Sequence, residues 1–161
     1  MNVLTASQLA VSALIASTLV AQPAGDPRTC PYTAAEVRQA LNLEVAEGLP
    51  AAPVAFPGGK RLSCRYNAPR GATASLWLTQ DAYDNPRDPS IGMMARMRAG
   101  TFQPVADDAD GAEFQEQGDL TNATLHYLRK GVQVEARVTI GPRDAGFAAM
   151  KGKLLKLRRI P

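Results

Sequence analysis

The stretch "ATLHYLRKGVQVEARVTI", residues 123–140, constrains the fold of this chain more than any other. Its second half alternates an apolar with a polar residue at every step, and Lys130-Gly131 before it suits a two-residue turn. Such a turn pairs Tyr127 with Val134 and Leu125 with Ala136. This register keeps the apolar residues on one side, so it predicts a β-hairpin with one buried face.

A second hairpin is predicted earlier in the chain, with the turn "APRG" between its strands. In "RLSCRYN" the residues Leu62, Cys64 and Tyr66 point one way. In "TASLWLTQ" the residues Leu76 and Leu78 share a face with Ala74. The alternation again gives each strand one apolar side.

Three segments carry helix signals. In "YTAAEVRQALNLEV", Thr33 and Glu36 form a capping box, and Asn42 is a plausible stop. Residues 88–100 predict a second helix, because Asp88 can cap it and Pro89 suits its first position. A third is predicted from Pro142 to about Arg159, with an apolar stripe formed by Phe147, Met150, Leu154 and Leu157.

The order helix, hairpin, helix, hairpin, helix predicts an α+β fold, in which an antiparallel sheet carries its helices on one face. Residues 32–80 and 86–141 follow a similar plan, although their sequences do not visibly match. We interpret them as two degenerate helix–hairpin halves followed by a C-terminal helix.

The N-terminal segment predicts export. Leu9–Ala21 is an uncharged, mostly apolar run, too short to span a bilayer but suited to the apolar region of a signal peptide. Cleavage after Ala21 leaves residues 22–161 as one globular domain, with no segment for stable membrane insertion. The alternative is a buried N-terminal helix, which the absence of a charge before Asp26 favours.

The two cysteines support export. Cys30 and Cys64 both follow the predicted cleavage site, and an even count in an exported chain predicts a disulfide. Two reduced, buried thiols in a cytosolic protein are the alternative. Neither cysteine has the spacing of a redox pair or a zinc site. The predicted location is periplasmic or secreted.

Charge is weakly informative. The net charge is +3 and the pI about 9.1, with no block of five or six like charges. This balance is compatible with an anionic envelope surface and gives no ground for nucleic-acid binding.

Four segments together resemble small exported bacterial domains of unknown function: "TCPYTAAEVRQALNLEV", "CRYNAPRGATASLWLT", "DGAEF" and "LRKGVQVEARV". The similarity covers most of residues 29–141. This chain has Asn42 where a glycine is usual, and Asp110-Gly111-Ala112 in place of Gly-Asp-x-Ala. The resemblance implies the Cys30–Cys64 pairing and no catalytic residues.

Catalysis is not predicted. His126 is the only histidine, and the hairpin register places it opposite Glu135 on the outer side of the sheet. An exposed pair of this kind contributes under about 1 kcal/mol, so His126→Ala should leave folding nearly unchanged. The alternative is a small envelope hydrolase with a carboxylate pair such as Asp81 and Asp84.

No metal or cofactor site is predicted either. The acidic stretch around Gly111 fails the EF-hand pattern, because Ala106 and Gln117 occupy the two end-ligand positions. We interpret it as a solvated loop. The basic residues near the C-terminus suit the end of a helix, although they could also contact anionic lipid or polymer; they are Lys151, Lys153, Lys156, Arg158 and Arg159.

Trp77 is the candidate binding residue. Strand parity places it opposite Leu76 and Leu78, on the polar side where Arg61 and Arg65 lie on the partner strand. A large aromatic among arginines is typical of a binding hot spot. The alternative is that the 44–60 loop or a helix covers Trp77. We therefore predict a non-catalytic exported binding module, such as an inhibitor, immunity or accessory protein, that binds a protein or an anionic envelope component.

Overall fold

The computed structural model describes residues 29–70, 74–85, 87, 89, 91, 101–117, 122–140 and 149–161. The predicted signal peptide and most of the helix predicted over 88–100 lie outside these residues. The elements, in chain order, are α1 (Ala34–Leu41), β1 (Leu49–Pro50), β2 (Val54–Phe56), β3 (Gly59–Asn67), β4 (Ser75–Tyr83), β5 (Gln103–Pro104), β6 (Glu113–Gln117), β7 (Asn122–Arg129), β8 (Val132–Thr139) and α3 (Met150–Leu154).

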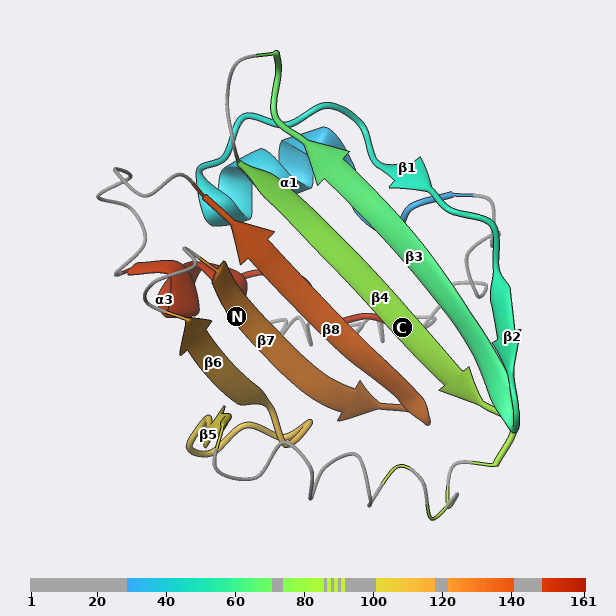
Figure 1. The fold of residues 1–161 in the computed structure, drawn as a ribbon. Helices are drawn as coiled ribbons and strands as arrows, with labels where there is room; N and C mark the ends of the chain where they lie inside the picture. Colours follow the sequence, from blue (N-terminus) through green and yellow to red (C-terminus); the bar gives the residue numbers. More distant parts are fainter. Residues whose placement is uncertain are drawn as a thin grey trace, which may run out of the picture.

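The described strands form one antiparallel sheet in the order β1-β3-β4-β8-β7-β6-β5, with β2 also paired to β3 (Figure 1). Both predicted hairpins, β3–β4 and β7–β8, are confirmed, and they meet in the centre through β4 and β8. Leu125 pairs with Ala136 as predicted. Lys130 and Gly131 have φ values of 49° and 76°, which a two-residue turn of this type requires. The α+β class is confirmed.

α1 begins and ends as the sequence predicts. Thr33 accepts a hydrogen bond from the Glu36 amide, and the Glu36 carboxylate accepts one from the Thr33 amide, which completes the capping box. Asn42 ends the helix in the left-handed conformation, with φ 55°. Val37 and Leu41 are fully buried against the apolar face of the sheet, in one core cluster. In Figure 1 the helix lies behind the upper ends of β3 and β4.

The C-terminal helix ends earlier than predicted, and its predicted first part, from Pro142 through Phe147, lies outside the described residues. α3 ends at Leu154, and turns carry the chain only to Leu157, before a segment without regular structure. Hydrogen bonds to distant residues replace the helical ones beyond that point. The Tyr32 hydroxyl donates to the Arg158 carbonyl at 2.6 Å, and the Ile160 amide donates to the Tyr127 hydroxyl at 3.1 Å. The sequence periodicity could not reveal these long-range competitors.

The predicted Cys30–Cys64 disulfide is present and ties the entry of α1 to β3. Gly48 crosses directly over it. A Cβ at residue 48 would lie 2.6 Å from the Tyr66 ring and 2.7 Å from the Cys30 Cβ, so only glycine fits without a shift. The disulfide, Gly48 and Tyr66 therefore form one close-packed corner.

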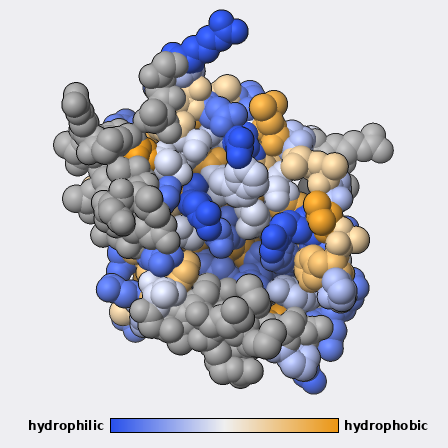
Figure 2. Space-filling model, in the orientation of Figure 1, coloured by the Kyte–Doolittle hydropathy of each residue, from blue (hydrophilic) through white to orange (hydrophobic). Residues whose placement is uncertain are grey.

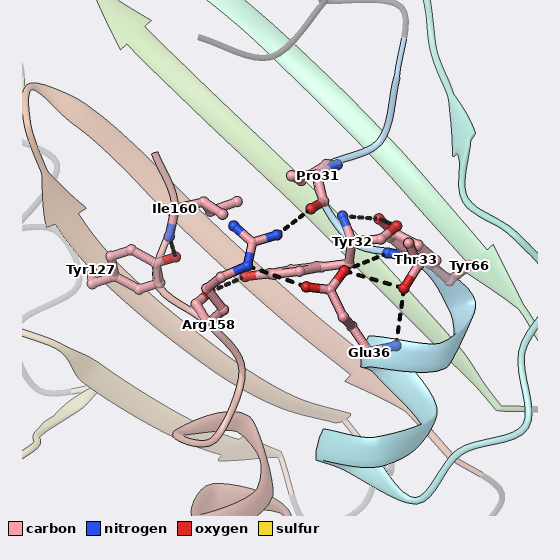
Figure 3. A network of polar contacts seen from close by, with 8 residues as sticks. All are labelled: Pro31, Tyr32, Thr33, Glu36, Tyr66, Tyr127, Arg158 and Ile160. Atoms are coloured by element: carbon pink, nitrogen blue, oxygen red, sulfur yellow. Dashed lines mark hydrogen bonds and ion pairs between the residues drawn. The ribbon is translucent and has the colours of Figure 1, made fainter. Parts of the chain in front are cut away.

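Polar contacts fasten the C-terminal segment to α1 and the sheet (Figure 3). We call this set the clasp; it comprises Tyr32, Glu36, Tyr66, Tyr127, Arg158 and Ile160. Within it, the buried Tyr66 hydroxyl accepts from the Tyr32 amide at 3.1 Å and donates to the Tyr32 carbonyl at 2.9 Å. Arg158 donates to Glu36 at 3.2 Å. Burial raises the pKa of the Tyr66 hydroxyl to about 12, and it raises the pKa of Tyr127 as well.

The acidic loop before β6 is also part of the structure. Asp108 accepts hydrogen bonds from the backbone amides of Asp110 and Ala112, and it pairs with Arg159. Asp110 contacts Arg129 at 3.4 Å. The expectation of a solvated loop was therefore wrong for these two carboxylates. Arg159 is also only 17% exposed in its side chain, so it serves as an anchor and not as part of a solvated helix end.

A duplicated helix–hairpin plan and helices on one face stay predictions. α1 precedes the first hairpin, whereas the helix expected before the second hairpin lies mostly outside the described residues.

Candidate binding face of the sheet

The sheet has two faces of opposite character. Its apolar face packs in the core, and the alternate residues of each strand point to the other side. We call this side the outer face. Over β3, β4 and β8 it carries Arg61, Ser63, Arg65, Trp77, Thr79, Asp81, Glu135 and Arg137. Figure 2 shows hydrophilic residues gathered over the middle strands, with apolar ones toward the β1–β2 side.

Trp77 lies in the middle of the outer face. Its Cα partners are Arg65 on β3 and Arg137 on β8, so an arginine flanks it on each side. The Arg65 guanidinium stacks over the indole, with 4.3 Å between its central carbon and the ring centroid. The side chain remains 37% exposed. The 44–60 segment borders the ring without covering it, so Trp77 is accessible to a partner.

The three arginines of this face differ in their ion pairs. Arg61 makes two hydrogen bonds to Asp81, each 2.7 Å long, and these raise the pKa of its guanidinium. Arg137 pairs with Glu135 at 2.9 Å. Arg65 has no carboxylate partner among the described residues. Of the predicted pair Arg61 and Arg65, the structure therefore places only Arg65 in contact with Trp77 and leaves it unneutralised.

A groove of about 300 Å³ runs beside Trp77. One wall is the β1 segment, in which Leu49 is 64% exposed. The other wall is formed by Arg65 and the indole. The full lining is Leu49, Pro50, Ala51, Ser63, Cys64, Arg65 and Trp77. The pattern of residues 44–60 predicts a long loop with at most one edge strand. It does not indicate that Leu49 pairs with Arg65, so this wall was not predicted.

The β7 end of the outer face is closed. His126 lies opposite Glu135 as predicted, yet it is only 5% exposed. Its ring contacts the Gln133 amide at 2.6 Å, and Glu113 lies 3.9 Å from its Nδ1. The Phe102 ring packs edge-on against the His126 ring, with 6.5 Å between the two ring centroids. The expectation of an exposed pair was wrong.

The consequences of His126→Ala follow from this burial. The His126 imidazole is buried and contacts a buried amide. Its removal is therefore expected to destabilise the fold, contrary to the prediction from the sequence. Register alone predicted the partner strand correctly but not the cover that Phe102 provides.

The hydrolase alternative, with Asp81 and Asp84 as its carboxylate pair, stays a hypothesis. Asp81 is held by Arg61, and neither Asp81 nor Asp84 lines the groove beside Trp77.

A second hollow of about 360 Å³ lies between α1 and the C-terminal segment. Its charged lining includes Glu36 and Arg158, which pair with each other in the clasp. Within the described residues, no three or more His, Cys, Asp and Glu side chains gather to hold a metal ion.

We compared the chain with protein-family models, curated proteins and solved structures, and none of them matched. The resemblance to small exported bacterial domains thus stays a prediction. In the part of the chain that the structure describes, no helix has the length and apolarity to cross a membrane.

Proposed function

We propose that this chain is a non-catalytic, exported binding module that holds a protein or an anionic envelope component on its outer face. One observation supports this most directly: Trp77 is partly exposed between Arg65 and Arg137, beside an apolar groove. Aromatic and arginine side chains contribute most of the energy at many interfaces. An inhibitor, immunity or accessory protein would use such a surface.

The proposal of export rests on the disulfide and the N-terminal sequence. Disulfides persist in oxidising compartments, and Cys30–Cys64 is formed here. Residues 1–21 have the composition of a signal peptide. Residues 22–161, located in the periplasm or outside the cell, would then be the active form.

Affinity capture tests the binding role. Purified residues 22–161, immobilised with the disulfide intact, are incubated with envelope extract from the source cells, and captured proteins and anionic polymers are identified by mass. We expect one stoichiometric partner, and Trp77→Ala should reduce its capture at least about 10-fold, as loss of a hot spot does. Leu128→Ala is the matched control, because Leu128 is 38% exposed on the same face but far from the groove.

Each variant is first checked for an unchanged thermal transition. Capture that survives Trp77→Ala, or that Leu128→Ala reduces equally, would contradict a binding role for the Trp77 region.

A further inference from the structure

Over β3, β4 and β8, Arg65 is the one described arginine of the outer face without a carboxylate partner. Asp81 neutralises Arg61 and Glu135 neutralises Arg137, but no described carboxylate pairs with Arg65. The Arg65 guanidinium lies over the Trp77 ring, and a guanidinium carries five N–H donors, so Arg65 can still offer a bidentate contact to a ligand. The ligand chemistry that complements this arrangement is a single carboxylate.

The groove next to Arg65 is mainly apolar. Leu49, Pro50 and Ala51 form one side of it, and the indole of Trp77 closes the other. A ligand that places its carboxylate on Arg65 therefore meets an apolar surface immediately beside that contact. An acidic group attached to an apolar neighbour fits both.

The groove does not enclose its contents. Leu49 is 64% exposed and Trp77 37% exposed, so the two walls are themselves open to solvent. Small-molecule sites usually bury most of their ligand. An open groove on a sheet face better suits a segment of a larger partner, which continues beyond the groove on both sides.

The partner does not extend the sheet. The edge segment next to the groove contains Pro50, Pro53 and Pro57, which have no backbone N–H to donate to an added strand. Contacts through side chains on the outer face remain, and Arg65, Trp77 and Leu49 provide them.

We propose that the groove binds a segment of a partner protein that presents an Asp or Glu carboxylate to Arg65 and an adjacent apolar side chain to Leu49 and Trp77. This inference rests on the proposed binding function and specifies the chemistry of its partner. Arg61, by contrast, is held by Asp81, so the proposal assigns the carboxylate contact to Arg65.

Peptide titration followed by NMR tests this specificity. Trp77 is the only tryptophan, so its indole N–H gives one assigned signal inside the groove. The probes are acetyl-Gly-Glu-Leu-Gly-amide and acetyl-Gly-Leu-Glu-Gly-amide, each with a Gln-for-Glu counterpart. We expect at least one Glu peptide to shift the indole signal saturably. Its Gln counterpart should bind about 5- to 10-fold more weakly, as loss of one charge-assisted contact implies.

Matched variants separate the two arginines. Arg65→Gln should abolish the preference for Glu over Gln, whereas Arg61→Gln should preserve it. Equal binding of the Glu and Gln peptides, no indole shift with any probe, or a preference that survives Arg65→Gln would each overturn the inference. An indole response to phosphatidylglycerol vesicles but to none of the peptides would also overturn it, since the anion would then belong to a lipid.

The capture experiment distinguishes a failure of the acidic specificity from a failure of the proposed binding function. If capture from envelope extract requires Trp77 but is unaffected by Arg65→Gln, the binding module stands and the acidic specificity falls. If capture does not require Trp77, both fall.

Discussion

Among the described residues, three arginines lie over aromatic rings, and their surroundings divide them into two kinds. In and beside the clasp, Arg158 lies 5.4 Å from the Tyr32 ring centroid and Arg159 lies 4.4 Å from that of Tyr127. On the outer face, Arg65 lies 4.3 Å from that of Trp77. Arg158 and Arg159 also bind carboxylates, of Glu36 and Asp108, whereas Arg65 binds none among the described residues.

The difference shows that pairing, and not residue type, separates a structural joint from a candidate binding surface. The tyrosine hydroxyls of the clasp bond to backbone groups, so these hydroxyls hold the fold together. Arg65 and Trp77, by contrast, can still contact a partner. Substitutions in the clasp should therefore change stability, and substitutions on the outer face should change binding.

The largest effect is expected from Arg159→Ala. Its removal leaves Asp108 without its cation, in a site where the Asp108 side chain is only 13% exposed, whereas Asp110 keeps Arg129. Loss of one member of a nearly buried ion pair should lower the free energy of unfolding by about 2–4 kcal/mol. Arg65→Ala is the matched control and should cost under about 1 kcal/mol. Urea unfolding followed by circular dichroism measures both; equal losses would remove the distinction between the regions.

The second-largest effect is expected at alkaline pH, which should lower the free energy of unfolding through Tyr66 of the clasp. Because the pKa of Tyr66 is about 12 in the folded protein and about 10 when unfolded, the unfolded state releases this proton first. The stabilisation is complete below pH 10 and is lost as the pH rises toward 12, by up to about 2 kcal/mol.

The Tyr66→Phe variant provides the control for the pH experiment. It should lose stability at pH 8, because the two Tyr32 backbone contacts disappear. It should then show a shallower decline above pH 10 in urea titrations. A decline as steep as that of the unmodified protein would exclude Tyr66 as its source.

The smallest effect concerns the exposure of Trp77. Its emission should lie at long wavelength and be quenched by iodide, because 37% of the side chain contacts solvent. The stacked cation should attract the iodide anion, so Arg65→Gln should reduce quenching by iodide more than quenching by neutral acrylamide. Blue-shifted emission that iodide cannot quench would contradict an open outer face.

Local patterns predicted the local structure well. Alternation and the Lys130-Gly131 turn determined the register of β7 and β8, because a slip of one residue would have turned Val134 and Leu125 out of the core. The capping box determined the start of α1 for the same local reason. The prediction for the end of the last helix was wrong. Beyond Leu157 the Arg158 carbonyl accepts from the Tyr32 hydroxyl and the Ile160 amide donates to the Tyr127 hydroxyl, and both tyrosines are distant in sequence.

The candidate site was predictable only in part. Parity within β3 and β4 placed Trp77 and Arg65 on one face, and the hairpin register brought them into contact. Parity cannot report what lies above a face, so the burial of His126 beneath Phe102 was missed. Nor can it indicate that Arg61 is neutralised by Asp81, since this depends on the cross-strand register.

The pairing of β4 with β8 has a consequence for how the chain matures. Ala82 pairs with Val132 and Ser75 with Thr139, so the central seam joins segments that are made far apart in time. Each hairpin can close early through its own turn, but the sheet is complete only when β8 of the second hairpin pairs with β4 of the first. A chain of this topology completes its core late in synthesis.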